Sequence, residues 1–197
     1  MKHERKATPA NTTRAALGGY LTTLIFTAAR RYMLAKHPAL PQPDPIASHV
    51  QFVHGVTKQT LTVRLTIMEI SLGARVSILQ ISLATTLQLC VLAVLTMGNL
   101  ATEQGVSLPA RPTIPKHQIP DRERDCMPDV PPEWMRPFVP MAFQGDNRIL
   151  KGARGAAWDA RFGRNVREKW CARTDADGFD VLSLGCLLDS VCLGSRV

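Results

Sequence analysis

No charged residue occurs between Val76 and Thr102, although 20% of the chain is charged. A run of this length is long enough to cross a bilayer as a helix. Polar side chains are spread along it, however, and polar groups near a bilayer centre are costly. We therefore expect two buried strands, at about 75–84 and 87–100, rather than a membrane span. The polar members of the run are Ser77, Gln80, Ser82, Thr85, Thr86, Gln88, Thr96 and Asn99.

The sequence also lacks the signals of secretion. Its first residues contain no apolar core of a signal peptide, and its five cysteines form neither a CxxC pair nor a tight disulfide framework. An odd number of cysteines without a signal peptide indicates a reducing compartment. The C-terminal Ser-Arg-Val is close to a peroxisomal targeting tripeptide but does not match it. We expect a cytoplasmic protein.

Several common functional motifs are missing. The chain has no G-x-S-x-G nucleophile elbow and no glycine loop of the kind that cradles phosphates. Its net charge is +8, but the basic residues are scattered and do not alternate with stacking aromatics, so nucleic acid is not an expected partner. His49 and His54 have no third ligand at a suitable spacing, so we expect no metal and no cofactor.

One long helix is predicted over residues 20–36, between a Gly-Gly pair and a group of prolines. Its apolar residues recur at the spacing of a single helix face: Leu21, Leu24, Ile25, Ala28 and Tyr32. We expect its basic residues, Arg30, Arg31 and Lys36, to form a solvated face. The alternative is that they contact the phosphates of coenzyme A.

Strands are predicted after this helix. Alternating apolar and polar residues over 61–67 indicate a strand with one buried face. The β-branched and aromatic residues of 49–55 indicate another strand. Near the end of the chain, the apolar residues of 179–191 are most simply a short helix.

The segment 105–147 has a different composition. Nine of the fourteen prolines gather in it, and no period of 2 or 3.6 residues can be found. This pattern predicts an extended linker or a surface wrap. The charged side chains of the segment, including Arg122 and Arg124, are expected to be solvated.

A helix that follows Gly-Gly and precedes four antiparallel strands is the order expected of a sheet that wraps a central helix. Six segments resemble the acyl-CoA thioesterase-like family with tandem hotdog repeats, especially its fungal members. They are GGY (18–20), HVQF (49–52), SLGARVS (71–77), TMGNLATEQGVSLP (96–109), RPTIPKHQIPDRERDC (111–126) and WCARTDADGFDVLSLGCLLDS (170–190). The resemblance implies an α+β hotdog fold, in which an antiparallel sheet wraps a long central helix, plus an incomplete second repeat.

The resemblance divides the chain into four parts. They are an N-terminal arm (1–17), a first hotdog repeat (18–104), a Pro-rich linker (105–147) and a partial second hotdog repeat (148–197). The family's second repeat continues past its helix into further strands, whereas this sequence ends at CLGSRV. We therefore expect a truncated second repeat.

The resemblance also implies a reaction, in which water attacks a thioester carbonyl. A carboxylate orients or deprotonates the water, and backbone N–H groups at a helix N-terminus stabilise the oxyanion. Asp189 matches the family's catalytic carboxylate, and Gly19 and Tyr20 are candidate substrate-binding residues through their amides. Tyr20 stands where related enzymes often carry Gln. The alternatives are that Asp189 is an ordinary polar residue near a helix end and that Gly19 and Tyr20 form a tight turn.

Two functions are consistent with these observations. The first is hydrolysis of an acyl-CoA or of a carrier-bound acyl or polyketide thioester, which the fungal resemblance connects with a secondary-metabolite pathway. The second is a catalytically inactive hotdog remnant that binds acyl chains or dimerises. A homodimer is expected because an incomplete second repeat leaves apolar surface to be covered.

Overall fold

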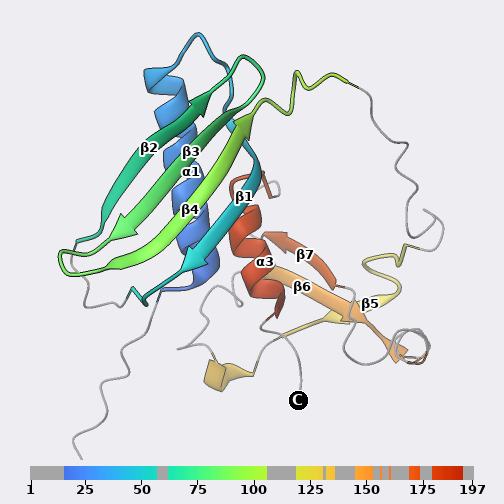
Figure 1. The fold of residues 1–197 in the computed structure, drawn as a ribbon. Coiled ribbons are helices and arrows are strands. Elements are labelled where there is room, and N and C mark those ends of the chain that lie inside the picture. The colour runs from blue at the N-terminus through green and yellow to red at the C-terminus, as the bar shows by residue number, and fades with distance from the viewer. Residues whose placement is uncertain are drawn as a thin grey trace, which may run out of the picture.

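The computed structural model describes residues 16–56, 62–105, 119–130, 132–135, 145–152, 156, 160, 169–173 and 179–192. Figure 1 shows a long helix that lies across one face of a four-stranded antiparallel sheet. A second, shorter helix lies beside the long one, and a three-stranded sheet completes the structure. The first helix and the larger sheet contain the main core, so they are the frame on which any site is built.

Helix α1 (Gly18–Lys36) is the helix predicted over 20–36, and it begins two residues earlier. One stripe of its surface is buried against the sheet, as the four-residue spacing of its apolar side chains requires. The stripe consists of Leu21, Ile25, Ala29 and Met33. The helix ends where His37 donates its backbone N–H to the carbonyl of Met33 at 2.9 Å and proline follows.

The four-stranded sheet has the order β1-β4-β3-β2. Its strands are β1 (Asp44–Phe52), β2 (Arg64–Leu72), β3 (Ser77–Ala84) and β4 (Leu89–Gly98). The uncharged run from Val76 to Thr102 forms β3 and β4, which pair antiparallel, so the prediction of two strands is confirmed. Among the described residues, no helix is long and apolar enough to cross a membrane.

The core lies between α1 and the inner faces of β3 and β4. Side chains of β3 alternate between buried and half-buried, as expected for a strand with one face against a core. Burial of each Leu or Ile here contributes about 1.5–3 kcal/mol to folding. The sheet side of the core consists of Leu79, Ile81, Leu83, Val91, Ala93, Leu95 and Met97, each at most 1% exposed.

Both edge strands are shifted from their predicted bounds, and each contains a bulge. β1 begins before the predicted 49–55, and its register shifts between Pro45 and Ala47. Proline cannot donate to a ladder, so a bulge on an edge strand is a position that tolerates it. β2 continues beyond the predicted 61–67, with a register shift between Glu69 and Ser71.

Ion pairs attach α1 to both edge strands. Nη2 of Arg30 lies 2.7 Å from Oδ1 of Asp44 on β1, and Nε of Arg30 donates to the carbonyl of Pro43. Nζ of Lys36 lies 2.9 Å from Oε1 of Glu69 on β2. The prediction of a solvated basic face is therefore wrong for Arg30, whose side chain is only 32% exposed. It is correct for Arg31, which is exposed.

The carboxylate of Glu69 gathers three side chains from the end of α1. Its Oε1 accepts a hydrogen bond from the Tyr32 hydroxyl at 2.5 Å and lies 2.7 Å from Nε2 of His37, in addition to the Lys36 contact. The hydrogen bond from Tyr32, followed by those from Lys36 and His37, lowers the pKa of Glu69 from 4.5 to about 2. The same cluster raises the pKa of Lys36, chiefly through its hydrogen bond with Tyr32. The C-terminal end of α1 is thereby fixed over β2.

The smaller sheet consists of β5 (Cys126–Pro128), β6 (Gly145–Leu150) and β7 (Lys169–Arg173), in the order β5-β6-β7. β5 and the 3-10 helix η2 (Glu133–Met135) lie within 105–147, where the sequence predicted no regular structure. Elements of three residues are too short for a hydrophobic period to reveal. Helix α3 (Leu184–Cys192) is the short helix predicted over 179–191, and it begins five residues later.

Charged side chains surround β6 and pair with one another. Nη1 of Arg148 lies 2.6 Å from Oε2 of Glu123, and its Nε lies 3.0 Å from Oδ1 of Asp146. Arg122 also pairs with Asp146, so the expectation that Arg122 is merely solvated is wrong. The hydrogen bond from Arg148 is the largest cause of a lowered pKa at Asp146.

Replacing the Glu69 carboxylate tests whether it fixes the end of α1 to β2. Glu69→Gln is expected to lower the free energy of unfolding at neutral pH, because an amide loses the charge that the three donors contact. The folded pKa of about 2 lies below the ordinary 4.5, so the stabilisation is complete above about pH 4.5 and is lost as the pH falls toward 2. Urea unfolding of both proteins across this range measures the difference. Glu103→Gln, at a side chain 53% exposed, is the matched control. A Glu69 effect that does not change with pH would contradict the account.

Candidate active site

Helix α1 begins without a side-chain cap. Leu17 occupies the N-cap position and makes no side-chain hydrogen bond there. The first N–H groups of a helix lack partners within it and carry partial positive charge. The backbone N–H of Gly19 donates instead to Oδ2 of Asp189 at 2.9 Å, across 170 positions of sequence. A carboxylate on α3 therefore does what a capping residue does in other helices.

Two glycines allow the helices to approach closely enough for this bond. A Cβ on Gly19 would lie 2.4 Å from the carbonyl oxygen of Gly185 and 2.6 Å from Cβ of Asp189. A Cβ on Gly185 would lie 2.8 Å from Cγ2 of Thr22. These distances are shorter than real Cβ contacts, and the first is to backbone, which cannot rotate away. The residue type at position 19 is thus dictated by packing between helices, not by a turn.

The residues of α3 that contact α1 lie on one face of the helix. Gly185, Cys186 and Asp189 are separated by one, three and four positions, and the last two spacings bring side chains together. The Thr23 hydroxyl donates to Sγ of Cys186 at 3.3 Å, a second link between the helices. Just before α3, Leu182 packs against the main core. Figure 1 shows the resulting arrangement, with α3 beside α1.

The start of α3 is fixed by local hydrogen bonds. The backbone N–H of Ser183 donates to Oδ1 of Asp180 at 2.9 Å, and the Ser183 hydroxyl accepts from the backbone N–H of Asp180. Leu187 then donates its N–H to the Ser183 carbonyl, which closes the first turn. The hydrogen bond from the Ser183 side chain is the largest cause of a lowered pKa at Asp180. A fixed first turn sets where Asp189 lies along the helix.

Of the three predicted site residues, the structure brings Gly19 and Asp189 into contact. Tyr20 follows Gly19 in the chain, but its side chain is 54% exposed and lies on a different face of α1. Gly185 and Cys186 were not predicted as contact residues. Their spacing from Asp189 could have predicted the contact, because residues three and four positions before a residue in a helix lie on the same face as that residue.

The arrangement has a definite chemical capacity. Asp189 is half-buried, and Gly19 holds one of its oxygens at the positive end of α1. The next amide of the helix, that of Tyr20, points in the same direction, toward the helix N-terminus. A carboxylate and a second backbone N–H donor are therefore adjacent. In the described part of the chain, no group of three or more His, Cys, Asp or Glu side chains could hold a metal ion.

Comparison with known families supports a thioesterase-like relationship. Residues 7–98 match the family model of the acyl-CoA thioesterase N-terminal domain. This segment contains α1 and the whole four-stranded sheet. A search of curated protein sequences finds no match.

Solved structures share the fold at low sequence identity. A proposed thioesterase from Novosphingobium aromaticivorans is 16% identical with a TM-score of 0.66, covering 93% of this chain and 64% of that one. A hotdog-fold protein of unknown function from Alicyclobacillus acidocaldarius is 16% identical with a TM-score of 0.54, covering 93% and 63%. The tesB protein of Mycobacterium avium subspecies paratuberculosis is 15% identical with a TM-score of 0.52, covering 93% and 58%. The chain has an α+β hotdog fold, as predicted, and spans less than two thirds of the length of each neighbour.

Alanine substitutions at the two adjacent glycines of α1 test the packing of the site. Gly19→Ala is expected to destabilise the protein by about 1–3 kcal/mol, because overpacking against backbone forces the helices apart. Gly18→Ala is the matched control, since the atoms nearest to its Cβ belong to the half-exposed ring of Phe52, the first at 3.1 Å. Alanine is also the better helix former, so this control should be neutral or stabilising. Urea unfolding measures both, and equal effects would contradict the account.

Proposed function

We propose that this protein hydrolyses acyl thioesters, with Asp189 as the general base and the N-terminus of α1 as the oxyanion site. The observation that carries the proposal is the 2.9 Å hydrogen bond between the Gly19 amide and the Asp189 carboxylate. It is supported by the match of residues 7–98 to the acyl-CoA thioesterase N-terminal domain and by a proposed thioesterase among the structural neighbours. The substrate is an acyl-CoA or an acyl group carried on a protein.

The proposed reaction has two steps. Asp189 takes a proton from water while the water oxygen bonds to the thioester carbonyl carbon, and the carbonyl oxygen becomes an oxyanion near the backbone amide of Tyr20. The intermediate then collapses, the carbon–sulfur bond breaks, and the thiolate takes the proton back from Asp189. The products are a carboxylic acid and a thiol. No covalent enzyme intermediate is involved.

In this proposal the bond from Gly19 to Asp189 positions the base. It holds Oδ2, and in the proposed mechanism the other oxygen takes the proton from water. A role in a fungal secondary-metabolite pathway is the finer part of the proposal and rests on the sequence resemblance. The division of the chain into an N-terminal arm (1–17), a first hotdog repeat (18–104), a Pro-rich linker (105–147) and a segment of a second repeat (148–197) is likewise proposed.

A second function is favoured by the same bond. Asp189 accepts a hydrogen bond from an N-terminal amide of α1, which has no side-chain cap of its own. This capping role explains the position of Asp189 without catalysis. The protein would then be an acyl-binding or dimerisation module. The two functions differ in whether the charge of Asp189, or only its ability to accept a hydrogen bond, is needed.

Homodimerisation is also proposed, and the outer face of the larger sheet is the proposed contact. Met68 on β2 and Val94 on β4 lie in one cross-strand row with Gln80 between them, and are 48% and 38% exposed. Met68→Glu should convert a dimer into a monomer in sedimentation velocity, because it places a charge in an apolar contact. A wild-type protein that sediments as a monomer would contradict this.

Asp189→Asn separates the two functions. The amide retains an acceptor for the Gly19 N–H but cannot act as a base, so hydrolysis should fall by a factor of about 10²–10⁴ while stability changes little. Asp189→Ala should lose the activity and also about 1 kcal/mol of stability with the cap. Initial rates against short-, medium- and long-chain acyl-CoA, with unfolding curves for all three proteins, provide the measurements. Unchanged hydrolysis by Asp189→Asn would exclude the general base. A folded wild type that hydrolyses none of these thioesters would identify the binding module.

A further inference from the structure

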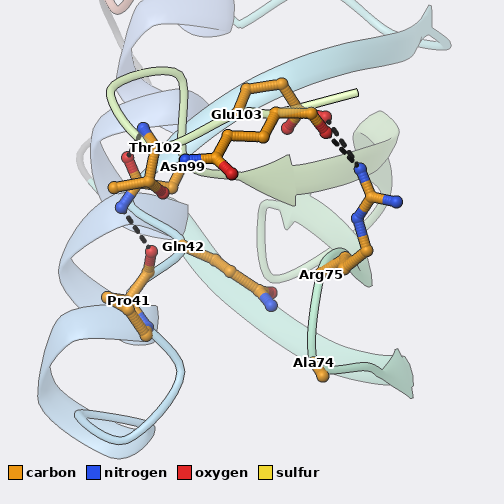
Figure 2. A pocket seen from close by; sticks show the side chains of 8 residues that line it. Pro41, Gln42, Ala74, Arg75, Asn99, Thr102 and Glu103 are labelled. Carbon is orange, nitrogen blue, oxygen red and sulfur yellow. Dashed lines mark hydrogen bonds and ion pairs between the residues drawn. The ribbon is translucent and has the colours of Figure 1, made fainter. Parts of the chain in front are cut away.

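A polar cleft of about 310 Å³ lies at the end of α1 opposite Gly19. Three connections form it: the one from α1 to β1 with Pro41 and Gln42, the turn between β2 and β3 with Arg75, and the segment after β4 that includes Asn99 and Glu103. Figure 2 shows these side chains around the cleft. α1 is about 27 Å long at 1.5 Å per residue, so the cleft is separate from the candidate active site.

Hydrogen bonds fix the walls of the cleft. Nδ2 of Asn99 donates to the carbonyl of Pro41 at 2.9 Å, which ties the segment after β4 to the connection before β1. Oδ1 of Asn99 accepts from the amides of Ala101 and Thr102. Oδ2 of Asp44 accepts from the amide of Leu100 at 3.0 Å. The walls are therefore ordered without a ligand, which reduces the entropy that binding has to overcome.

Gln42 is the one buried residue among the eight that line the cleft, at 2% exposed. Its Nε2 donates to the carbonyl of Gly73 at 2.7 Å, which fixes the orientation of the amide. Its Oε1 is buried and has no hydrogen-bond partner. A buried acceptor without a hydrogen bond lowers stability by about 1–3 kcal/mol. A ligand that donates a hydrogen bond to this oxygen would remove that cost. The amide extends toward the turn that carries Ala74 and Arg75 (Figure 2).

The mouth of the cleft carries one charge of each sign. Nη2 of Arg75 lies 3.4 Å from Oε1 of Glu103, and the two side chains are 75% and 53% exposed. Nη2 of Arg75 also donates to the carbonyl of Gln104 at 2.9 Å, which holds the guanidinium at the mouth. An exposed ion pair of this length contributes little to stability. A ligand can therefore replace it at small cost.

We propose that this cleft binds a small zwitterion of the α-amino-acid type. Its carboxylate pairs with Arg75, and its ammonium group donates to Glu103 and to Oε1 of Gln42. A simple anion leaves Gln42 without a donor and meets the charge of Glu103, and a neutral polyol leaves both charges without a counterion. The inference goes beyond the proposed thioesterase function and is independent of it, because it uses none of the residues around Asp189.

Binding of neutral L-amino acids to the intact chain tests the proposal, with titration calorimetry and ligand-observed NMR as readouts. At least one of them should bind saturably, and glycine betaine should bind at least tenfold more weakly because it keeps both charges but has no N–H donor. Acetate and inorganic phosphate are the anion controls. Arg75→Gln and Glu103→Gln, both at exposed side chains, should each weaken binding at least tenfold. Gln42→Met should do the same if it folds.

The outcomes are distinct. Saturable binding that betaine does not reproduce and that both charge variants weaken supports the proposal. If betaine binds as tightly as the amino acid, Gln42 does not accept a hydrogen bond from the ligand, and the proposal is overturned. If phosphate binds as tightly, the site only binds an anion at Arg75, and the proposal is likewise overturned. Absence of binding by every amino acid to folded wild type also overturns it. The thioesterase assay is unaffected by any of these results, so failure of one proposal is distinguishable from failure of the other.

Discussion

The close approach of α1 and α3 at Gly19 and Gly185 is the contact on which the candidate active site depends. A side chain at position 19 would collide with the backbone of α3. With glycine there, Asp189, one turn beyond Gly185, comes within 2.9 Å of the Gly19 amide. The positive end of a helix stabilises a nearby carboxylate. The contact that packs the two helices therefore also orients the carboxylate.

The rest of the structure holds α1 in place so that this contact can form. A buried stripe fixes the helix against the sheet, and Arg30 ties its middle to β1 through Asp44. Glu69 fixes its C-terminal end through three side chains. A helix restrained at several points presents two well-defined ends: an uncapped N-terminus next to Asp189, and a polar cleft beyond its C-terminus. The two ends differ in chemistry because the first offers backbone amides and the second offers side chains of both charges.

Much of the fold could be predicted because its signals are local. The recurring apolar residues of 20–36 and the spaced polar residues of the uncharged run predicted a helix and two strands. The resemblance named the fold and gave Asp189, Gly19 and Tyr20 as separate site residues. Contacts without a local signature were missed. The need for glycine at 185 comes from Thr22, more than 160 positions away, and the pairing of Arg122 with Asp146 joins a segment without periodicity to a strand. β5 was not predicted because a strand of three residues is too short to show an alternating pattern. The exposed side chain of Tyr20 could not be foreseen, since a Gly-Gly-Tyr sequence does not reveal which helix face meets a partner.

The central claim is that the carboxylate of Asp189 on α3 accepts a hydrogen bond from the backbone N–H of Gly19 on α1. The most direct measurement is the backbone amide resonance of Gly19, followed by ¹⁵N NMR as the pH is lowered. We expect this resonance to shift on acidification, and we expect the shift to disappear in Asp189→Asn while the pH response of the other α1 amide resonances is unchanged. A Gly19 resonance that responds identically in wild type and Asp189→Asn would contradict the account.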